Sequence, residues 1–237
     1  MSPDMVADVG NTRIKWCACR AGLLGSMVSL PEDENEWAKA APLGALTWVL
    51  ASVRPERSER LRRWLEQRGD RVRLLTVTDL PLSMDVEFPA RTGIDRLLNA
   101  VAAVSRLDSG EAAVVVDAGS AVTVDLVDGC HVFRGGTIFP GIDLMAEALH
   151  RYTAFLPRVT VTLPLPPVPA RSTIPAIQQG IYRAVVGGIK EIVAVYGVRR
   201  VFLTGGQAAV LAPALSDYEW WPEMTLMGIH RSAEGLP

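Results

Sequence analysis

The chain has 237 residues, of which 49% are hydrophobic and 21% are charged, and its formal net charge at pH 7 is -2. This is the composition of a soluble globular protein, long enough for one large domain or two small ones. The charge gives no reason to expect a nucleic acid or an anionic membrane surface as a partner. No apolar run reaches membrane-spanning length, the N-terminus lacks a secretory signal pattern, and three cysteines without metal-ligand spacing indicate reduced thiols. We therefore expect a cytoplasmic protein.

The first third of the chain predicts strands that alternate with helices. Three short strands are expected within 5–30, a helix at 31–40, a strand at 46–53, a helix at 55–68 and a strand at 72–77. In the 55–68 helix the arginines alternate with glutamates, which favours a solvated face over a nucleic-acid patch. The proline-bounded residues 81–89 then form a connector.

The remainder begins with an amphipathic helix after Gly93. The next expected elements, in order, are a strand at 114–116 with hairpin partners up to Ile138, a glycine-rich turn at 135–141, a helix at 142–151, a proline-rich loop at 157–169, a long helix from Ile174 to Ile192 and a strand at 201–206. The final stretch, 220–237, carries an apolar segment at 226–229 and a polar tail.

Two stretches share one pattern: an apolar run, then Asp-x-Gly, then a small polar residue. They are Val6–Asn11 and Val114–Ser120. A single turn of this kind is an ordinary hairpin, but two in corresponding places predict a duplicated unit whose acidic turns face a common cleft. We therefore expect an α/β protein with domains at 1–90 and 91–237, whose C-terminal segment is free to pack back on the first domain.

The Asp8–Thr12 turn fits phosphate and Mg²⁺ chemistry, because a glycine lets backbone N–H groups approach an anion and a nearby carboxylate can hold Mg²⁺. Asp-x-Gly is also a common turn sequence. Lys15 either reaches back to the turn or faces solvent, and the sequence leaves both interpretations open.

Gly93-Ile94-Asp95-Arg96 pairs an acid with a base at a helix start. Thr92 and Asp95 have capping-box spacing, so Asp95 either satisfies the helix N-terminus or accepts a hydroxyl proton while Arg96 holds an anionic substrate. The Gly205-Gly206 turn either admits a flat ligand, such as a base or ribose, or simply joins a strand to a helix.

Together, five motifs in this order resemble the type III pantothenate kinase family over essentially the whole chain. They are Asp8–Thr12, Gly93–Arg96, Asp117–Ser120, Gly135–Gly141 and Thr204–Gly206. The resemblance implies two ribonuclease-H-like domains of the actin-like ATPase fold, with an ATP cleft between them. It also implies phosphorylation of pantothenate in the first step of coenzyme A synthesis, a homodimer, and the use of ATP, Mg²⁺ and a monovalent cation (K⁺ or NH₄⁺).

Residue by residue, the resemblance implies four groups of site residues. The ATP phosphate loop would comprise Asp8, Val9, Gly10, Asn11, Thr12, Arg13, Ile14 and Lys15. The pantothenate site would comprise Gly93, Ile94, Asp95, Arg96 and Thr173, with Asp95 as the catalytic proton acceptor. Asp117 would hold the monovalent cation, and Ser120 would contact ATP.

Four positions depart from the family pattern. Val86 stands where a tyrosine usually packs on pantothenate, Ser120 and Val122 where threonine is usual, and Ser172 where asparagine is common. The change at Val86 keeps a second hypothesis open, a non-catalytic regulator of the same fold that binds nucleotide or pantothenate. A third is a small-molecule kinase that acts on another alcohol.

Overall fold

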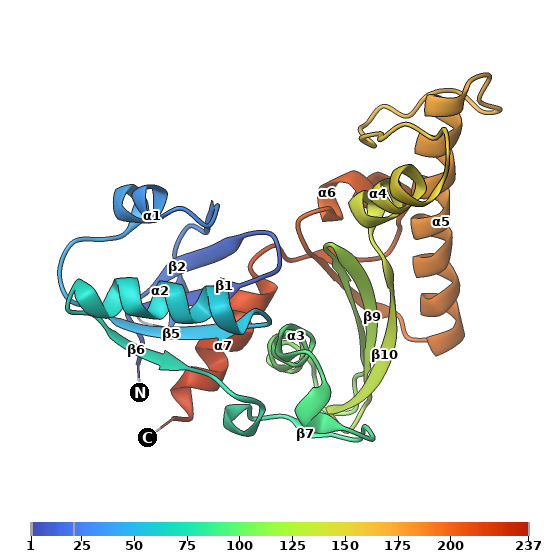
Figure 1. Ribbon diagram of the computed structural model, residues 1–237. Helices are drawn as coiled ribbons and strands as arrows, with labels where there is room; N and C mark the ends of the chain where they lie inside the picture. The colour runs from blue at the N-terminus through green and yellow to red at the C-terminus, as the bar shows by residue number, and fades with distance from the viewer. Residues whose placement is uncertain (1, 21, 237) are drawn as a thin grey trace. The chain divides into compact units, whose positions relative to one another are not determined.

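A computed structural model describes residues 2–20 and 22–236 (Figure 1). Two sheets, each with its own helices, make up the fold. Among the helices in these ranges, none combines the length and the apolar character that crossing a membrane would need.

The first sheet has the strand order β3-β2-β1-β5-β6, and β4 pairs with β2 beside this path. Its strands are β1 (Met5–Val9), β2 (Ile14–Arg20), β3 (Leu23–Leu24), β4 (Val28–Leu30), β5 (Thr47–Ser52) and β6 (Arg71–Leu74). Strand β1 is antiparallel to β2 and parallel to β5, which is parallel to β6. Strands β1 and β5 read as nearly continuous apolar runs because both of their faces are covered.

The second sheet repeats this plan around β8, in the order β12-β11-β8-β9-β10. Its strands are β8 (Ala113–Ala118), β9 (Ala121–Val127), β10 (Val132–Pro140), β11 (Arg200–Thr204) and β12 (Glu219–Trp220), and β7 (Ser83–Met84) pairs with the start of β10. Strand β8 is antiparallel to β9 and parallel to β11, which is parallel to β12. The duplicated unit that the two Asp-x-Gly turns predict is therefore present.

Each sheet has its own hydrophobic core. The helices are α1 (Glu34–Ala40), α2 (Pro55–Gln67), α3 (Ile94–Val104), α4 (Ile142–Tyr152), α5 (Thr173–Tyr196), α6 (Ala208–Leu211) and α7 (Met224–Glu234), with short 3-10 turns at Val77–Asp79, Pro89–Arg91 and Ala212–Ala214. In the first core Trp16 and Trp48 meet edge to face, with ring centroids 5.3 Å apart. In the second, Ile181, Val185 and Ile189 of α5 recur at helical spacing and are buried, as the sequence predicts.

The compact units divide the chain differently from the boundary expected at residue 90. The first unit extends to Asp108 and includes His131–Phe133 and the segment from Glu223 onward, and the second contains Ser109–Cys130 and Arg134–Pro222. Helix α3 belongs to the first unit because it packs on α7, where the buried Thr225 hydroxyl donates to Asn99 Oδ1 at 2.8 Å. The C-terminal segment thus packs back on the first unit.

Two local expectations need correction. Residues 135–140 form the end of β10 and not a turn, and a side chain at Gly136 would collide with the backbone of Val124 and Asp125 in β9. The glycine is needed there for close approach of two strands. The stretch around 226–229 is part of the eleven-residue helix α7, whereas the sequence indicated only an apolar segment and a tail.

Candidate active site

The first unit holds the predicted phosphate loop, which follows β1. The β1–β2 register places Asp8 directly opposite Lys15, with Ala51 of β5 on the other side. Directly opposed residues of an antiparallel pair project from the same face. The half-buried Lys15 therefore shares a face with Asp8, which favours the interpretation in which its ammonium serves an anion beside the turn.

The loop itself is closed by its backbone. The Gly10 N–H donates to the Arg13 carbonyl at 3.1 Å. A Cβ at Gly10 would lie 3.2 Å from that same oxygen, so a larger residue would loosen the turn. Between these two residues, Asn11 and Thr12 are exposed. The loop can therefore present backbone N–H groups to an anion from solvent.

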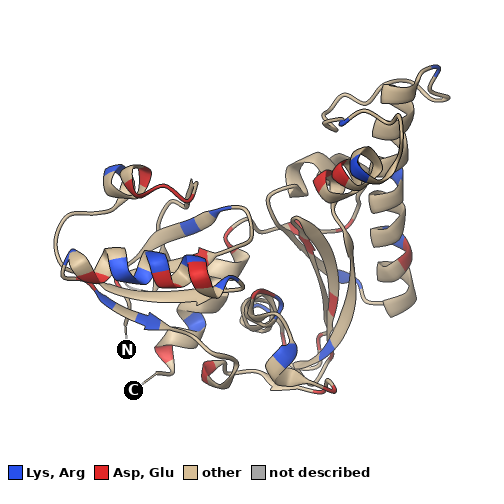
Figure 2. Cartoon of the chain, in the orientation of Figure 1, with Lys and Arg blue, Asp and Glu red and all other residues tan. Residues whose placement is uncertain are grey.

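Arg57 also holds this loop, and the sequence interpretation missed it. Its Nη1 donates to the Gly10 carbonyl at 2.9 Å and its Nε to Glu32 at 2.7 Å. Figure 2 shows basic and acidic residues alternating along α2, as a solvated face would. Arg57 differs from the exposed arginines of that helix because its side chain is only 14% exposed. The spacing pattern that identified the solvated face does not reveal which arginine turns inward.

The predicted catalytic residue, Asp95, lies in the first turn of α3. The capping box expected between Thr92 and Asp95 does not form, because Gly93 is the N-cap and no side chain caps the helix. One oxygen of Asp95, Oδ1, accepts the N–H of Arg96 at 2.8 Å. In the part of the chain that the structure describes, Oδ2 has no hydrogen-bond partner. The carboxylate is thus anchored by one oxygen and has the other available to accept a proton.

Two arginines close to Asp95 in the sequence lie over aromatic rings. The Arg96 guanidinium lies 5.7 Å from the centroid of the Phe133 ring, and that of Arg91 lies 5.2 Å from the Phe88 ring. Phe88 is 53% exposed, two residues beyond the partly buried Val86. Phe88 therefore supplies an exposed aromatic ring in this connector, one position before Pro89. The family pattern places the aromatic residue at the position of Val86.

The second unit holds the other acidic turn, after β8. Asp117 lies opposite Thr123 of β9 and beside Thr204 of β11. The Thr123 hydroxyl is buried and has no hydrogen-bond partner within the described residues. The side chains that share this face carry oxygen atoms, which are the ligands that hard cations take.

Backbone contacts hold this second turn in place. The Gly141 N–H donates to the Ser120 carbonyl at 2.9 Å, and the Gln207 N–H donates to the Ala118 carbonyl at 2.8 Å. A Cβ at Gly205, whose φ is +99°, would collide with Ala118. The strand-to-helix turn therefore explains Gly205. A Cβ at Gly206 would meet nothing within 4 Å, so a ligand role for that glycine stays a prediction.

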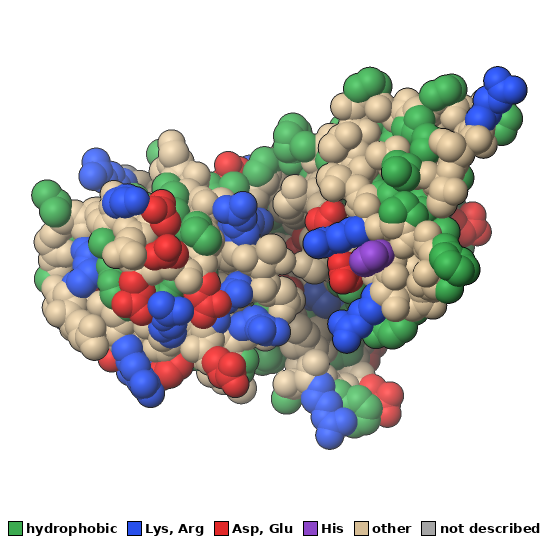
Figure 3. Space-filling view, turned by 45° about the horizontal axis from the view of Figure 1, so that its top comes forward, with side chains coloured by type: hydrophobic (Ala, Val, Ile, Leu, Met, Phe, Trp, Pro, Cys, Tyr) green, Lys and Arg blue, Asp and Glu red, His purple; other side chains and the backbone are tan. Residues whose placement is uncertain are grey.

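Thr173 is the first residue of α5 and is exposed. It lines an apolar groove of about 690 Å³ between α4 and α5, with Pro140, Met145, Leu149 and Ile177 among the other lining residues. Hydrophobic side chains gather on the visible surface of the second unit (Figure 3), and the exposed ones near this groove include Leu144, Tyr152, Phe155 and Ile174.

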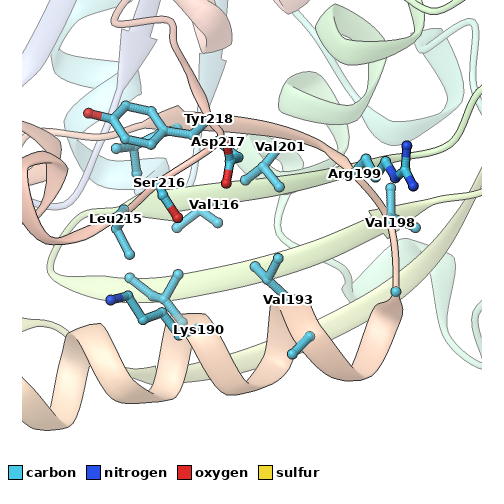
Figure 4. A pocket seen from close by; sticks show the side chains of 14 residues that line it. Val116, Lys190, Val193, Val198, Arg199, Val201, Leu215, Ser216, Asp217 and Tyr218 are labelled. Atoms are coloured by element: carbon cyan, nitrogen blue, oxygen red, sulfur yellow. The ribbon is translucent and has the colours of Figure 1, made fainter.

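A second cavity, of about 730 Å³, lies within the second unit between the C-terminal half of α5, β11 and residues 215–218 (Figure 4). Valines and leucines make up much of its lining, which also includes Lys190, Arg199 and Asp217. None of the site residues that the sequence predicts lines this cavity.

The donor set limits how metal ions could be held. Within residues 2–20 and 22–236, no group of three or more His, Cys, Asp or Glu side chains is placed to bind a metal ion. Mg²⁺ commonly takes one or two carboxylates together with substrate phosphates and water. A single carboxylate at Asp8 fits that mode, and the oxygen-lined face at Asp117 fits a second cation.

The comparisons with known proteins agree with the motif order. A family model described as type III pantothenate kinase matches residues 5–195. A type III pantothenate kinase of Gloeobacter violaceus is 32% identical over 98% of this chain and 98% of its own length. One of Rhodopirellula baltica is 40% identical over 61% of this chain, and the match spans 54% of that relative's length.

Solved structures show the fold. A Campylobacter jejuni protein described as a Baf family transcriptional activator superposes with a TM-score of 0.66 at 19% identity, over 97% of both chains. A Sinorhizobium meliloti protein described as a 2-dehydro-3-deoxygalactonokinase has a TM-score of 0.60 at 12% identity, over 97% of this chain and 98% of that one. The chain thus has the two-unit α/β fold of actin-like ATPases and sugar kinases.

Proposed function

This chain belongs to the type III pantothenate kinase family, and we propose that it transfers a phosphoryl group from ATP to the primary hydroxyl of pantothenate. The product would be 4'-phosphopantothenate, the first intermediate on the way to coenzyme A. The family match over 5–195 is the observation that carries this proposal. The free cysteines Cys17, Cys19 and Cys130 support a reducing, cytoplasmic location.

Asp95 serves as the proton acceptor in this proposal. Its Oδ1 is anchored on the Arg96 N–H, and its Oδ2 is available to the substrate hydroxyl. Phosphoryl transfer asks little of such a base, because positioning and charge stabilisation supply most of the catalysis. Arg96 holds the pantothenate carboxylate, Gly93 and Ile94 line the site, and Thr173 contributes a further contact.

The ATP phosphates bind the loop from Asp8 to Lys15. Asp8 holds Mg²⁺, which neutralises charge on the phosphates when bound, and Lys15 contributes a positive charge from the same face of the sheet. Asp117 holds a monovalent cation, K⁺ or NH₄⁺, and Ser120 contacts ATP. The hydroxyls of Thr123 and Thr204 next to Asp117 support an oxygen-ligated ion there.

The active form in this proposal is a homodimer. The apolar groove between α4 and α5 and the exposed Leu144 and Phe155 support it, since apolar patches of this kind on a soluble protein commonly mark interfaces.

An ADP-release assay with pantothenate and Mg-ATP, run in K⁺ and again in Na⁺, tests the activity. Asp95→Asn keeps the size of the side chain but removes the base, and we expect turnover to fall by about 10²- to 10⁴-fold with an unchanged melting temperature. Asp33→Asn is the control, because Asp33 is an exposed helix N-cap that asparagine replaces well, and it should retain activity.

The outcomes separate the alternatives. No ADP release in K⁺ at millimolar ATP would refute the kinase, and ligand binding without ADP release would assign a regulator. Turnover with another alcohol but not with pantothenate would assign the third hypothesis. Near-normal turnover by Asp95→Asn would remove Asp95 from its role.

A further inference from the structure

We propose that Arg57 is a positioning residue that sets the orientation of the Gly10–Asn11 peptide, so that the Asn11 N–H is presented to the phosphates of ATP. The inference rests on the proposed function, because it takes the Asp8–Lys15 loop as the phosphate loop. Arg57 itself contacts the loop backbone and not the substrate.

The environment of Arg57 distinguishes it from its neighbours on α2. Its side chain is 14% exposed, whereas those of Arg60, Arg62 and Arg63 are 47%, 39% and 69% exposed. The exposed arginines pair with glutamates at the surface, where such pairs contribute little. Arg57 instead joins an acid on a distant segment to a backbone carbonyl.

Arg57 connects three parts of the first unit. Its Nε donates to Glu32 Oε2 at 2.7 Å, which orients the guanidinium, and its Nη1 donates to the Gly10 carbonyl at 2.9 Å. Because the guanidinium is planar and its donors are fixed in a fork, the carboxylate on one side determines where the other donor points. Glu32 therefore orients Arg57, and Arg57 orients Gly10.

The consequence for the loop follows from peptide geometry. In a planar trans peptide the C=O of one residue and the N–H of the next point in opposite directions. With the Gly10 carbonyl held on Arg57, the Asn11 N–H points away from Arg57. Asn11 is exposed, and this N–H has no hydrogen-bond partner among the residues that the structure describes. An unpaired, oriented N–H beside a glycine is the donor that phosphate-binding loops use.

Without Arg57 the peptide could rotate, because Gly10 tolerates backbone conformations that other residues avoid. The carbonyl would then be free to face the phosphates, and its partial negative charge would repel them. A defect of this kind lowers affinity for the phosphate part of the nucleotide and leaves the nucleoside part unaffected.

Calorimetry on the full chain tests the inference with two probes, the non-hydrolysable ATP analogue AMP-PNP (with Mg²⁺) and adenosine. We expect Arg57→Gln to weaken AMP-PNP binding by about tenfold, the effect of losing one charge-assisted hydrogen bond, while adenosine binding stays within twofold. Glu32→Gln should weaken AMP-PNP binding by a smaller factor in the same direction. Arg63→Gln, on the same helix but at the surface, should change neither.

Kinetics complete the test. In the active enzyme Arg57→Gln should raise KM for ATP about tenfold and leave KM for pantothenate unchanged, and Arg57→Lys should recover part of the loss. Equal weakening of AMP-PNP and adenosine, or no weakening of either, would overturn the inference. A wild-type chain that discriminates AMP-PNP from adenosine but does not phosphorylate pantothenate would refute the kinase and leave Arg57 in its role. A wild-type chain that binds neither probe would overturn both.

Discussion

The two acidic turns have the same place in the two sheets but are held by different means. The first, at Asp8–Thr12, is tied by a side chain that comes from another element, since Arg57 of α2 bonds the Gly10 carbonyl. The second, at Asp117–Ser120, is tied by main-chain N–H groups of Gly141 and Gln207. A turn held by a side chain can be adjusted by one substitution, whereas a turn held between backbones depends on close approach at glycines such as Gly141 and Gly205.

The faces beside the two acids also differ. Lys15 lies opposite Asp8, whereas Thr123 lies opposite Asp117, at the equivalent place after the turn. An ammonium group next to a carboxylate attracts the phosphates that bring Mg²⁺ with them, whereas hydroxyl oxygens next to a carboxylate can ligate a cation directly. One duplicated scaffold thus supports two chemistries, and a single residue of the following strand accounts for much of the difference.

The largest effect should come from the backbone-held turn. Gly205→Ala would place a Cβ against the backbone of Ala118 at a φ of +99°, which combines backbone strain with overpacking and should cost about 3 kcal/mol. For a chain of this size that lowers the melting temperature by about 6–12 °C. Scanning calorimetry measures it.

Gly206→Ala is the neighbouring control, because a Cβ at Gly206 would meet nothing within 4 Å. It should melt within about 2 °C of the wild type. Equal melting temperatures for both variants would mean that the second turn is not held by the close backbone contact at Gly205.

The next effect separates the two acids by the ion each one serves. Asp8→Asn should lower kcat/KM by about 100-fold at ordinary Mg²⁺ and regain part of it as Mg²⁺ is raised, because a carboxylate ligand is replaced by a neutral amide. Asp117→Asn should instead remove the difference between K⁺ and Na⁺ and leave the Mg²⁺ dependence unchanged. Initial rates over a grid of the two ions measure both. If either variant changed both dependences equally, the two turns would not have separate roles.

Much of the fold could be predicted from the sequence because its main signals are local. A run of β-branched residues located β8, alternation located β9, and helical spacing located the buried face of α5. The errors arose where distant segments decide the outcome. Gly136 locally resembles a turn residue, but it lies in strand β10. It is a glycine because β9 approaches too closely there for a side chain.

In the candidate site, too, local signals could be predicted and contacts between distant segments could not. The position of Asp95 at a helix start could be predicted, but the failure of the Thr92 cap and the free Oδ2 depend on the path of residues 88–93. Arg57 could not be singled out, because it lies in a helix where more than half of the residues are charged. Only its contact with the loop after β1 makes it different. Phe88 lies two residues from Val86, the position that the family pattern matches, so the pattern does not identify it.

A smaller difference concerns the strands that follow the two turns. Strand β2 carries Cys17 and Cys19 on one face, and β9 has no cysteine. The neighbouring Cys17 thiol, and then the His230 imidazole of α7, lower the pKa of Cys19 to about 6 against the opposing effect of burial. The nearby Cys19 raises the pKa of His230, and Cys19 together with burial raises that of Cys17. These shifts favour the thiolate form of Cys19 and the thiol form of Cys17.

The sign of the pH dependence follows from these shifts. The pKa of Cys19 is lower in the folded chain, so the stability that its thiolate contributes is complete above about pH 9 and is lost as the pH falls through about 6. The pKa of His230 is raised, so its contribution is complete below 6.5 and is lost as the pH rises through the folded value. As the pH rises, the Cys19 contribution to the free energy of unfolding grows while the His230 contribution falls, so the two partly cancel. A thiol reaction therefore reports the protonation state of Cys19 more directly than stability does.

Alkylation by iodoacetamide, followed at the Cys19 peptide by mass spectrometry, gives the smallest of these effects. The rate should level off just above pH 6, and at pH 7 it should exceed that of a thiol of pKa 9.0 by only about fourfold, because a lower pKa also makes the thiolate a weaker nucleophile. Cys17→Ser removes the main cause of the low pKa and should move the midpoint upward, and His230→Gln should move it upward by less. A wild-type rate that continues to rise to pH 9 would show that Cys19 is an ordinary thiol at neutral pH, and Lys15 and Thr123 would then be the chemical difference that remains between the two strands.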